Sequence, residues 1–351
     1  MSIRVGLIGL HRGVQVHLPA FKANSKYDLA AVCARTPGVA ERVAAEHNVP
    51  YWYTDVRKLL AARLDLIAIA SPPPTHAGYA AAALAAGKHV LLEVAYTSTA
   101  ADARVLAEQA RARGRVGAAA YGLRFVPTLR HVTNVLEQGV LGRLQLMHMD
   151  FYNDLLADAP DSYPWLWAGD HGGGIFANYL AHGLDLARRW FGPVAAVEAT
   201  YATRTPRPRR SGDEHPAEDT GVVAVQFESG MLATFGFCAV VATRLNRLAL
   251  HGAQGSLLVD NFGESAQLLS MGDDTPRPLF PPTVYLEETR GETGLLAGFP
   301  VLLDRLAAAI TGEGSATDLP TLDEALEVQR VVDAARIAAR EHRQVYLHEV
   351  G

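Results

Sequence analysis

The hydrophobic positions of the first 120 residues form short apolar runs separated by segments with helical spacing. The strand-like runs are Ile3 to Ile8, Leu29 to Cys33, Leu64 to Ala70, His89 to Leu92 and Val116 to Ala120. The helical segments between them are residues 14 to 24, Gly38 to His47, His76 to Ala86 and Ala100 to Arg113. Strands that alternate with helices in this way predict an α/β fold with a parallel, doubly wound sheet.

After Arg124 the pattern changes to longer alternating runs, which predict a large, mostly antiparallel sheet. These runs are Leu144 to Phe151, Val194 to Ala202, Gly221 to Phe227, Met231 to Val241, Leu245 to His251 and Ser256 to Val259. Four helices are expected to cover one face of the sheet and leave the other open: Pro127 to Gln138, Ile175 to Phe191, Phe299 to Thr311 and Leu322 to Glu341. We therefore predict an α+β second domain, with domains at 1–121 and 122–351.

Composition narrows the class of partners. The 351 residues carry a net charge of −5, which gives no electrostatic reason to bind nucleic acid. No leader precedes Ile3 and no run reaches 18 uninterrupted apolar residues, so we expect a cytoplasmic protein with no membrane partner. The two cysteines, Cys33 and Cys238, lie in different predicted domains, and no H-x-H or H-E-x-x-H motif occurs. We expect neither a disulfide framework nor a metal site.

The first strand ends in a turn that could hold a phosphate group. In an open α/β sheet, ligands bind beyond the carboxyl ends of the strands, and the first turn offers backbone amides to a pyrophosphate. Here the turn reads Gly9-Leu10-His11-Arg12-Gly13-Val14. Compared with G-x-G-x-x-G it keeps the first glycine, has His11 at the second and offers Gly13 one place early. A remodelled phosphate site and a tight structural turn both remain open.

The end of the second strand bears on which dinucleotide is bound. It reads Ala34-Arg35-Thr36, where proteins that bind NAD usually have an acidic residue for the ribose hydroxyls. An arginine suits a 2′-phosphate, so Arg35 and Thr36 favour NADP(H) over NAD(H). The alternative is a solvated arginine at a strand end.

Two further runs are specific in wording and spacing: Ala68-Ile69-Ala70-Ser71-Pro72-Pro73-Pro74-Thr75-His76 and Gly87-Lys88-His89-Val90-Leu91-Leu92-Glu93. With them the chain resembles the Gfo/Idh/MocA family of NAD(P)-dependent oxidoreductases. The resemblance extends along the whole chain, through Arg124-Phe125-x-Pro127, Gly172-Gly173-Gly174 with His182 and Asp185, and Gly252-x-x-Gly255-Ser256.

This resemblance implies an N-terminal Rossmann domain and hydride transfer between nicotinamide C4 and a sugar, cyclitol or similar small molecule. It also implies a C-terminal domain whose open sheet mediates assembly, so we expect a homodimer or homotetramer. The cofactor-binding candidates are Gly9, His11, Arg12, Gly13, Arg35, Thr36, Ser71, Pro72, His76 and Glu93.

The catalytic positions implied by the resemblance differ in this chain. A lysine is expected in an E-K-P motif, but the sequence reads Glu93-Val94-Ala95, and a valine can neither accept a proton nor polarise a carbonyl. Lys88 lies six residues earlier, roughly 20 Å away along the strand at about 3.3 Å per residue. No lysine occurs after it. Asn178 stands where an aspartate is expected, so His182 is the remaining member.

Asn178, His182 and Asp185 are spaced i, i+4 and i+7 and share one helix face. Without the resemblance, this spacing is typical of the solvent-exposed face of an amphipathic helix. With the resemblance it faces the substrate: His182 is the candidate proton donor and Asn178 orients an oxygen. Further aromatic candidates, each with a structural role as the alternative, are Tyr121 for catalysis and Tyr96, Trp165, Trp167 and Tyr179 for substrate contact. Asp185, from the same helix face, is also a candidate for substrate contact.

Three hypotheses follow. The first is an NADP(H)-dependent oxidoreductase that reduces an imine, enone or activated ketone of a small molecule, with His182 or a tyrosine as proton donor. The second is a redox-neutral lyase, cyclase or isomerase in which the cofactor is unused or vestigial. The third is a non-catalytic binding protein.

Overall fold

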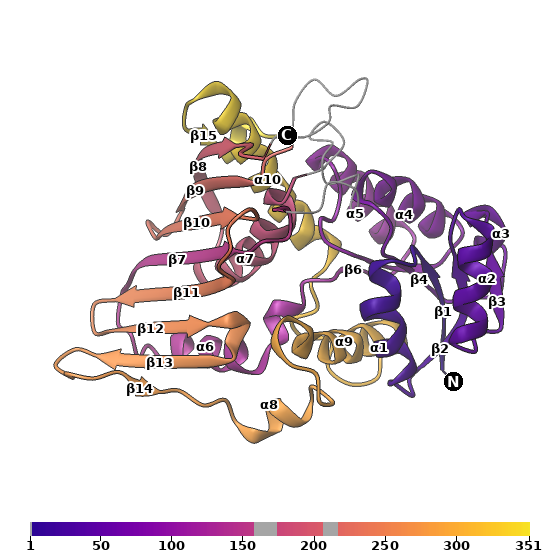
Figure 1. The fold of residues 1–351 in the computed structure, drawn as a ribbon, viewed down its shortest axis with the longest axis horizontal. Helices are drawn as coiled ribbons and strands as arrows, with labels where there is room; N and C mark the ends of the chain where they lie inside the picture. The colour runs from indigo at the N-terminus through magenta and orange to yellow at the C-terminus, as the bar shows by residue number, and fades with distance from the viewer. Residues whose placement is uncertain (1, 158–173, 206–216) are drawn as a thin grey trace. The chain divides into compact units, whose positions relative to one another are not determined.

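The computed structural model describes residues 2–157, 174–205 and 217–351, and the chain divides into two compact units (Figure 1). Unit 1 comprises Met1–Tyr121 and Phe299–Leu326, and unit 2 comprises Gly122–Gly298 and Glu327–Gly351. The first division falls after residue 121, between the predicted domains 1–121 and 122–351. The prediction that 122–351 forms one domain is wrong for Phe299–Leu326, because this stretch packs with unit 1.

Unit 1 is built on a six-stranded parallel sheet in the order β3-β2-β1-β4-β5-β6. Its strands are β1 (Ile3–Ile8), β2 (Tyr27–Cys33), β3 (Tyr51–Tyr53), β4 (Leu66–Ile69), β5 (His89–Leu92) and β6 (Gly117–Ala119). The predicted doubly wound sheet is confirmed. The edge strand β3 and the short helix α3 (Val56–Leu60) were not predicted, because Tyr51 and Trp52 are exposed and leave no buried apolar run.

The helices of unit 1 follow the predicted segments closely. They are the π-helical turn η1 (Gly13–His17), α1 (Leu18–Lys22), α2 (Pro37–Glu46), the 3-10 turn η2 (Pro73–Thr75), α4 (His76–Ala85), α5 (Ala100–Ala112) and α9 (Phe299–Thr311). Thr36 precedes α2 with extended backbone, and Pro37 opens the helix. A proline is tolerated at that position because its missing N–H has no intrahelical partner.

Helix α9 corrects one prediction. It was predicted to cover the C-terminal sheet, but it belongs to unit 1, where the hydroxyl of Tyr27 donates to the carbonyl of Leu303 at 2.6 Å. The stretch Gly294–Thr311, with a mean hydropathy of 1.5, is long and apolar enough to cross a membrane by length and composition alone. Leu302 and Leu306 on α9 are fully buried, which is the behaviour of a core helix. An apolar helix must bury its surface, but the pattern does not specify its partner.

Unit 2 contains a nine-stranded sheet in the order β14-β13-β12-β11-β7-β10-β9-β8-β15. The strands are β7 (Leu144–Tyr152), β8 (Val194–Ala202), β9 (Thr220–Phe227), β10 (Leu232–Cys238), β11 (Leu245–Gly252), β12 (Gly255–Asp260), β13 (Ser265–Ser270), β14 (Arg277–Pro278) and β15 (Val345–Tyr346). Every pair is antiparallel except β7 with β10, which confirms the predicted mostly antiparallel sheet.

Helix α7 (Phe176–Phe191) packs on one face of this sheet. The ring of Phe176 lies 5.3 Å from that of Phe237, and Tyr179 stacks on Phe151 at 5.5 Å. The other helices and turns of unit 2 are η3 (Gly122–Phe125), α6 (Pro127–Glu137), η6 (Asn261–Gly263), α8 (Thr283–Glu287), η7 (Gly294–Gly298), η8 (Leu347–Glu349) and α10 (Leu322–Glu341) from Glu327 on.

Candidate functional site

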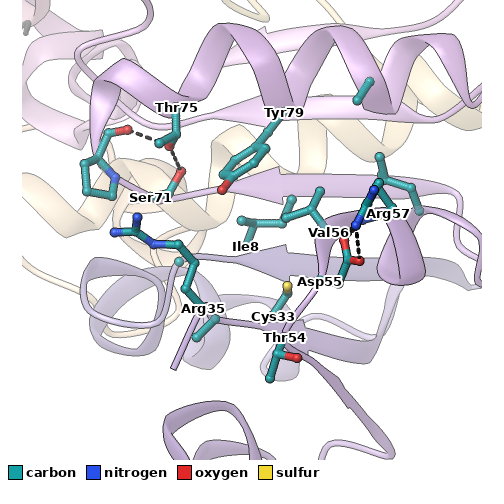
Figure 2. Close-up of a pocket in the computed structure, with 15 residues that line it drawn as sticks. Ile8, Cys33, Arg35, Thr54, Asp55, Val56, Arg57, Ser71, Thr75 and Tyr79 are labelled. Carbon is teal, nitrogen blue, oxygen red and sulfur yellow. Dashed lines mark hydrogen bonds and ion pairs between the residues drawn. The ribbon is translucent and has the colours of Figure 1, made fainter. Parts of the chain in front are cut away.

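A pocket in unit 1 lies at the carboxyl ends of β1, β2, β3 and β4 and has a volume of about 460 Å³. Figure 2 shows Tyr79 of α4 on one side, Cys33 and Ile8 beneath it, Arg35 and Ser71 toward one end and the Asp55–Arg57 pair toward the other. In a doubly wound sheet this is the place where a dinucleotide binds. The pocket therefore lies where the sequence predicted it.

Gly9 lies at the closest approach between two strand ends. Its φ of +92° is unfavourable for residues with a Cβ, and a Cβ there would overlap the backbone nitrogen of Ser71. The first glycine of the turn is thus required by the backbone geometry. Gly13 is buried in η1, whereas the side chains of His11 and Arg12 are exposed on the loop.

The loop after β4 is held by its own hydroxyl groups. The Ser71 and Thr75 hydroxyls lie 2.6 Å apart, and that of Thr75 donates to the carbonyl of Pro72 at 2.8 Å. Ser71 and Pro72 line the pocket. These contacts fix the backbone that lines this side of the pocket.

Two cationic side chains line the pocket, and they differ in their partners. Arg57 donates to the carboxylate of Asp55 at 2.9 and 3.2 Å, and these hydrogen bonds lower the pKa of Asp55. Arg35 is exposed, and within the described parts of the chain its side chain makes no hydrogen bond or ion pair. An uncommitted guanidinium beside a dinucleotide pocket fits a phosphate group.

The strand end after β5 surrounds a buried carboxylate. One oxygen of Glu93 accepts a hydrogen bond from His17 Nε2 at 2.9 Å, the other accepts from the Val94 amide at 3.0 Å, and Arg12 Nε lies 3.9 Å away. Burial by itself raises the pKa of Glu93, but His17, Arg12 and the amide outweigh it and lower the pKa to about 2. Glu93 is therefore ionised at neutral pH. The Val94–Ala95 peptide bond is cis.

His76 holds the same segment from the side of β4. Its Nε2 lies 2.5 Å from the carbonyl oxygen of Ser71, and its Nδ1 lies 3.0 and 3.2 Å from those of Ala95 and Tyr96. Burial lowers the pKa of His76, against the opposing influence of these carbonyls. His76 is thus buried in the framework of the site and does not line the pocket.

Two tyrosines proposed from the sequence are buried in unit 1. Tyr96 is 1% exposed, and burial raises the pKa of its hydroxyl. Tyr121 is equally buried, two residues beyond the end of β6. A structural role, the alternative considered for both, fits this burial, and neither the substrate contact of Tyr96 nor the catalytic role of Tyr121 gains support.

In unit 2, the predicted stripe on α7 is divided between half-buried and buried residues. Asn178 and His182 are half-buried. Asp185 is buried, and its carboxylate accepts two hydrogen bonds from Arg124 at 2.6 and 2.5 Å. The interpretation of Asp185 as part of a solvent-exposed helix face is wrong, because Asp185 is buried and its ion pair with Arg124 anchors α7 to η3. Its predicted substrate contact has no support in unit 2.

The other polar groups at this end of α7 are locally engaged. The Asn178 amide donates to the carbonyl of Gly174 at 3.3 Å, and the Tyr179 hydroxyl accepts from Asn153 Nδ2 at 2.7 Å. Tyr179 is half-buried and stacks on Phe151. Asn178, Tyr179 and His182 thus form a partly accessible polar group on one helix.

Glu218 contacts the first residues of α7, and it was not among the residues predicted from the sequence. Its backbone carbonyl accepts from the Ile175 amide at 3.3 Å, and its carboxylate accepts from the Phe176 amide. A Cβ at Gly174 would overlap this carboxylate. Burial raises the pKa of Glu218 to about 7, against the attraction of Arg336. Glu218 lies between two predicted strands, Val194 to Ala202 and Gly221 to Phe227, where no local pattern distinguishes a carboxylate that becomes buried.

His17 was missed for a similar reason, because a single histidine within an apolar helical run is typical of a core position.

The predicted substrate residues Trp165 and Trp167, with Gly172 and Gly173, lie outside the described residues. Within the described parts of the chain, no group of three or more His, Cys, Asp or Glu side chains could hold a metal ion.

A parallel sheet in the order 3-2-1-4-5-6 with a pocket at its strand ends defines a dinucleotide-binding protein. Residues 3–121 match the oxidoreductase family with an NAD-binding Rossmann fold, and residues 129–258 match the GFO/IDH/MocA C-terminal domain. The chain therefore belongs to the Gfo/Idh/MocA family and is an NAD(P)-binding oxidoreductase.

Proteins of similar sequence match most or nearly all of the chain. An uncharacterized oxidoreductase of Synechocystis sp. is 29% identical over 265 residues, which is 74% of this chain and 71% of that protein. Inositol 2-dehydrogenase of Rhizobium meliloti is 26% identical over 361 residues, covering 98% of this chain and 99% of that one. A solved structure of levoglucosan dehydrogenase with NADH and levoglucosan has a TM-score of 0.89 at 21% identity, covering 99% and 100% of the two chains. The last comparison shows likeness of fold.

Proposed function

We propose that this protein is an NADP(H)-dependent oxidoreductase that reduces an imine, enone or activated ketone of a small molecule. The observation that carries the proposal is Arg35, an exposed guanidinium in the dinucleotide pocket with no partner among the described residues. A 2′-phosphate offers it a charge-assisted, bidentate hydrogen bond. Thr36 follows at the start of α2 and is also exposed.

The choice of acceptor rests on the strand end at Val94. The reduced cofactor supplies a hydride when bound, and the substrate then needs a proton. Val94 has no proton to give, and Glu93 is held ionised by His17, so neither residue is a general acid. The reduction of an imine, enone or activated ketone depends less on a general acid, because these substrates are already activated.

We assign the proton donor to His182, with Tyr121 as the second candidate. His182 is half-buried on α7, one helical turn after Asn178, whose amide can orient a substrate oxygen. Tyr121 is buried, which favours His182. The His182→Ala substitution is expected to reduce turnover by about 10²-fold or more without changing cofactor affinity.

The experiment that tests the cofactor assignment is a calorimetric titration with NADPH and NADH. Wild-type protein is expected to bind NADPH more tightly, and Arg35→Ala to remove most of that difference at about 1.5–3 kcal/mol for a charged hydrogen bond. Arg42→Ala is the matched control, since Arg42 is exposed on α2 and pairs with Glu46. Equal affinity of the wild type for both cofactors would refute the NADP assignment.

The redox-neutral alternative is favoured by the same Val94, since an oxidoreductase of secondary alcohols needs a base there. It predicts turnover of a substrate with unchanged mass or loss of water, and no need for nicotinamide. Product mass spectrometry with and without NADPH distinguishes the two functions, because strict dependence on NADPH excludes the alternative.

We further propose a cytoplasmic homodimer or homotetramer that assembles through the open face of the nine-stranded sheet. Val222 on β9 and Leu232 on β10 are 56% and 50% exposed and lie four register positions apart on the same face of these neighbouring strands, and burial of such apolar side chains favours association. Leu232→Glu is expected to reduce the mass measured by light scattering, whereas Val105→Glu on α5 of unit 1 is not. An unchanged mass of the Leu232→Glu variant would mean that the subunit interface lies elsewhere. Cell fractionation tests the proposed cytoplasmic location, and recovery of the protein in another fraction would contradict it.

A further inference from the structure

The four residues after β5, Glu93 to Tyr96, are held from two sides by buried histidines. This segment contains Val94, where the resemblance led us to expect a lysine. The histidines come from different parts of unit 1, His17 from η1 and His76 from the start of α4. Neither faces the pocket described above.

The first support comes from His17 and acts through the carboxylate of Glu93. Glu93 accepts from His17 Nε2 and from the Val94 amide, so one carboxylate ties η1 to the backbone of residue 94. Because Glu93 is ionised, His17 Nε2 must be the donor in this contact. Arg12, 3.9 Å from the same carboxylate, extends the contact to the phosphate loop.

The second support acts on the next two peptide units. His76 Nδ1 lies within hydrogen-bond distance of the carbonyls of Ala95 and Tyr96, while its Nε2 contacts the carbonyl of Ser71. The ring is 1% exposed, so these contacts do not compete with water. A neutral imidazole has one N–H, so the hydrogen bond to the carbonyls of residues 95 and 96 requires the tautomer with its proton on Nδ1.

The strand order indicates which half of a bound dinucleotide this segment would face. A dinucleotide lies across the point where the strand order reverses, between β1 and β4. The pocket with Arg35 and Tyr79 is on the β2 and β3 side and suits the adenosine half. The carboxyl ends of β4 and β5, where His76 and Glu93 act, are therefore on the nicotinamide side.

We propose that His76 is a positioning residue for the nicotinamide half of the cofactor: it fixes the backbone of residues 95 and 96 against the end of β4, while the His17–Glu93 pair fixes residue 94. The inference rests on the proposed cofactor function. It explains how a strand end without a lysine keeps a defined shape. It also predicts that the two halves of the cofactor respond differently to the loss of His76.

The test compares two probes by calorimetry: NADPH, and 2′,5′-ADP, which carries only the adenosine half with its 2′-phosphate. The His76→Gln variant retains a polar atom near the position of Nε2 but loses the contact to Ala95 and Tyr96. We expect it to weaken NADPH binding about tenfold, which is about 1.4 kcal/mol, and to change 2′,5′-ADP binding less than about twofold. His76→Asn, which keeps a donor near the position of Nδ1, is expected to restore most of the NADPH affinity.

His89→Gln is the matched control, because His89 lies at the opposite end of β5 and its Nδ1 accepts from the Val116 amide at 2.9 Å. It is expected to bind both probes like the wild type. Equal weakening of both probes in His76→Gln, or no weakening, overturns the proposal. If His76→Gln does not fold, Glu93→Gln serves in its place with the same expected selectivity.

The two levels of failure are distinguishable in one set of titrations. A wild type that binds neither NADPH nor NADH refutes the cofactor function itself. If the wild type prefers NADH, the same comparison is made with NADH and ADP, and a selective loss of NADH binding in His76→Gln still supports the positioning role.

Discussion

Replacing Glu218 by glutamine should remove a pH dependence from the stability of the protein. In the folded chain, burial raises the pKa of Glu218 from 4.5 to about 7, while Arg336 and the Phe176 amide oppose the rise. A raised carboxyl pKa means that folding favours the protonated form. The stabilising effect is fully present below about pH 4.5 and is lost as the pH rises through about 7.

The magnitude follows from the size of the change. Each unit of pKa is about 1.4 kcal/mol, so a change from 4.5 to about 7 corresponds to at most about 3–4 kcal/mol of unfolding free energy between pH 4.5 and pH 8. Glutamine has nearly the same shape and no charge in this range. The difference in stability between wild type and Glu218→Gln should therefore move in favour of the variant as the pH rises.

Urea unfolding at intervals from pH 4.5 to 8 measures this difference directly. Glu228→Gln is the control, because Glu228 is an exposed glutamate in the same unit. It should leave the pH profile of the wild type unchanged. A constant difference between wild type and Glu218→Gln across the whole range would refute the reasoning, since it would mean that Glu218 titrates alike in the folded and unfolded chains.

Three further predictions concern residues in fixed contacts. Glu93→Gln should remove stability present above about pH 4.5 and lost as the pH falls toward about 2, so acid unfolding of wild type and variant should converge at low pH. Arg124→Ala should cost about 3–5 kcal/mol in urea unfolding, because it leaves the carboxylate of Asp185 buried without its partner, and a loss below about 1 kcal/mol would contradict this. Gly9→Ala should cost more than about 1 kcal/mol and weaken NADPH binding in calorimetry, because its Cβ would overlap the backbone of Ser71; unchanged binding would argue against the close approach.

Much of the fold could be predicted from the sequence because its information is local. A buried strand such as Ile3–Ile8 is a mostly apolar run interrupted only by Arg4, and α10 is a long stretch of helical spacing, so both were predicted close to their observed bounds. Gly9 was recognised because it matches the first glycine of G-x-G-x-x-G at the end of the first strand, and the structure adds that its φ is +92°. The exposed strand β3 lacked such a signal.

The sequence by itself determined the order of the elements, the class of fold and the identity of residue 94. Only the tertiary structure decided which polar groups are engaged: Asp185 binds Arg124 across 61 residues, and Glu93 binds His17 across 76. The physical reason is that a charge in a periodic pattern looks the same whether water or a distant partner solvates it. Burial then determines the role of the residue, and burial depends on chain segments far away in the sequence.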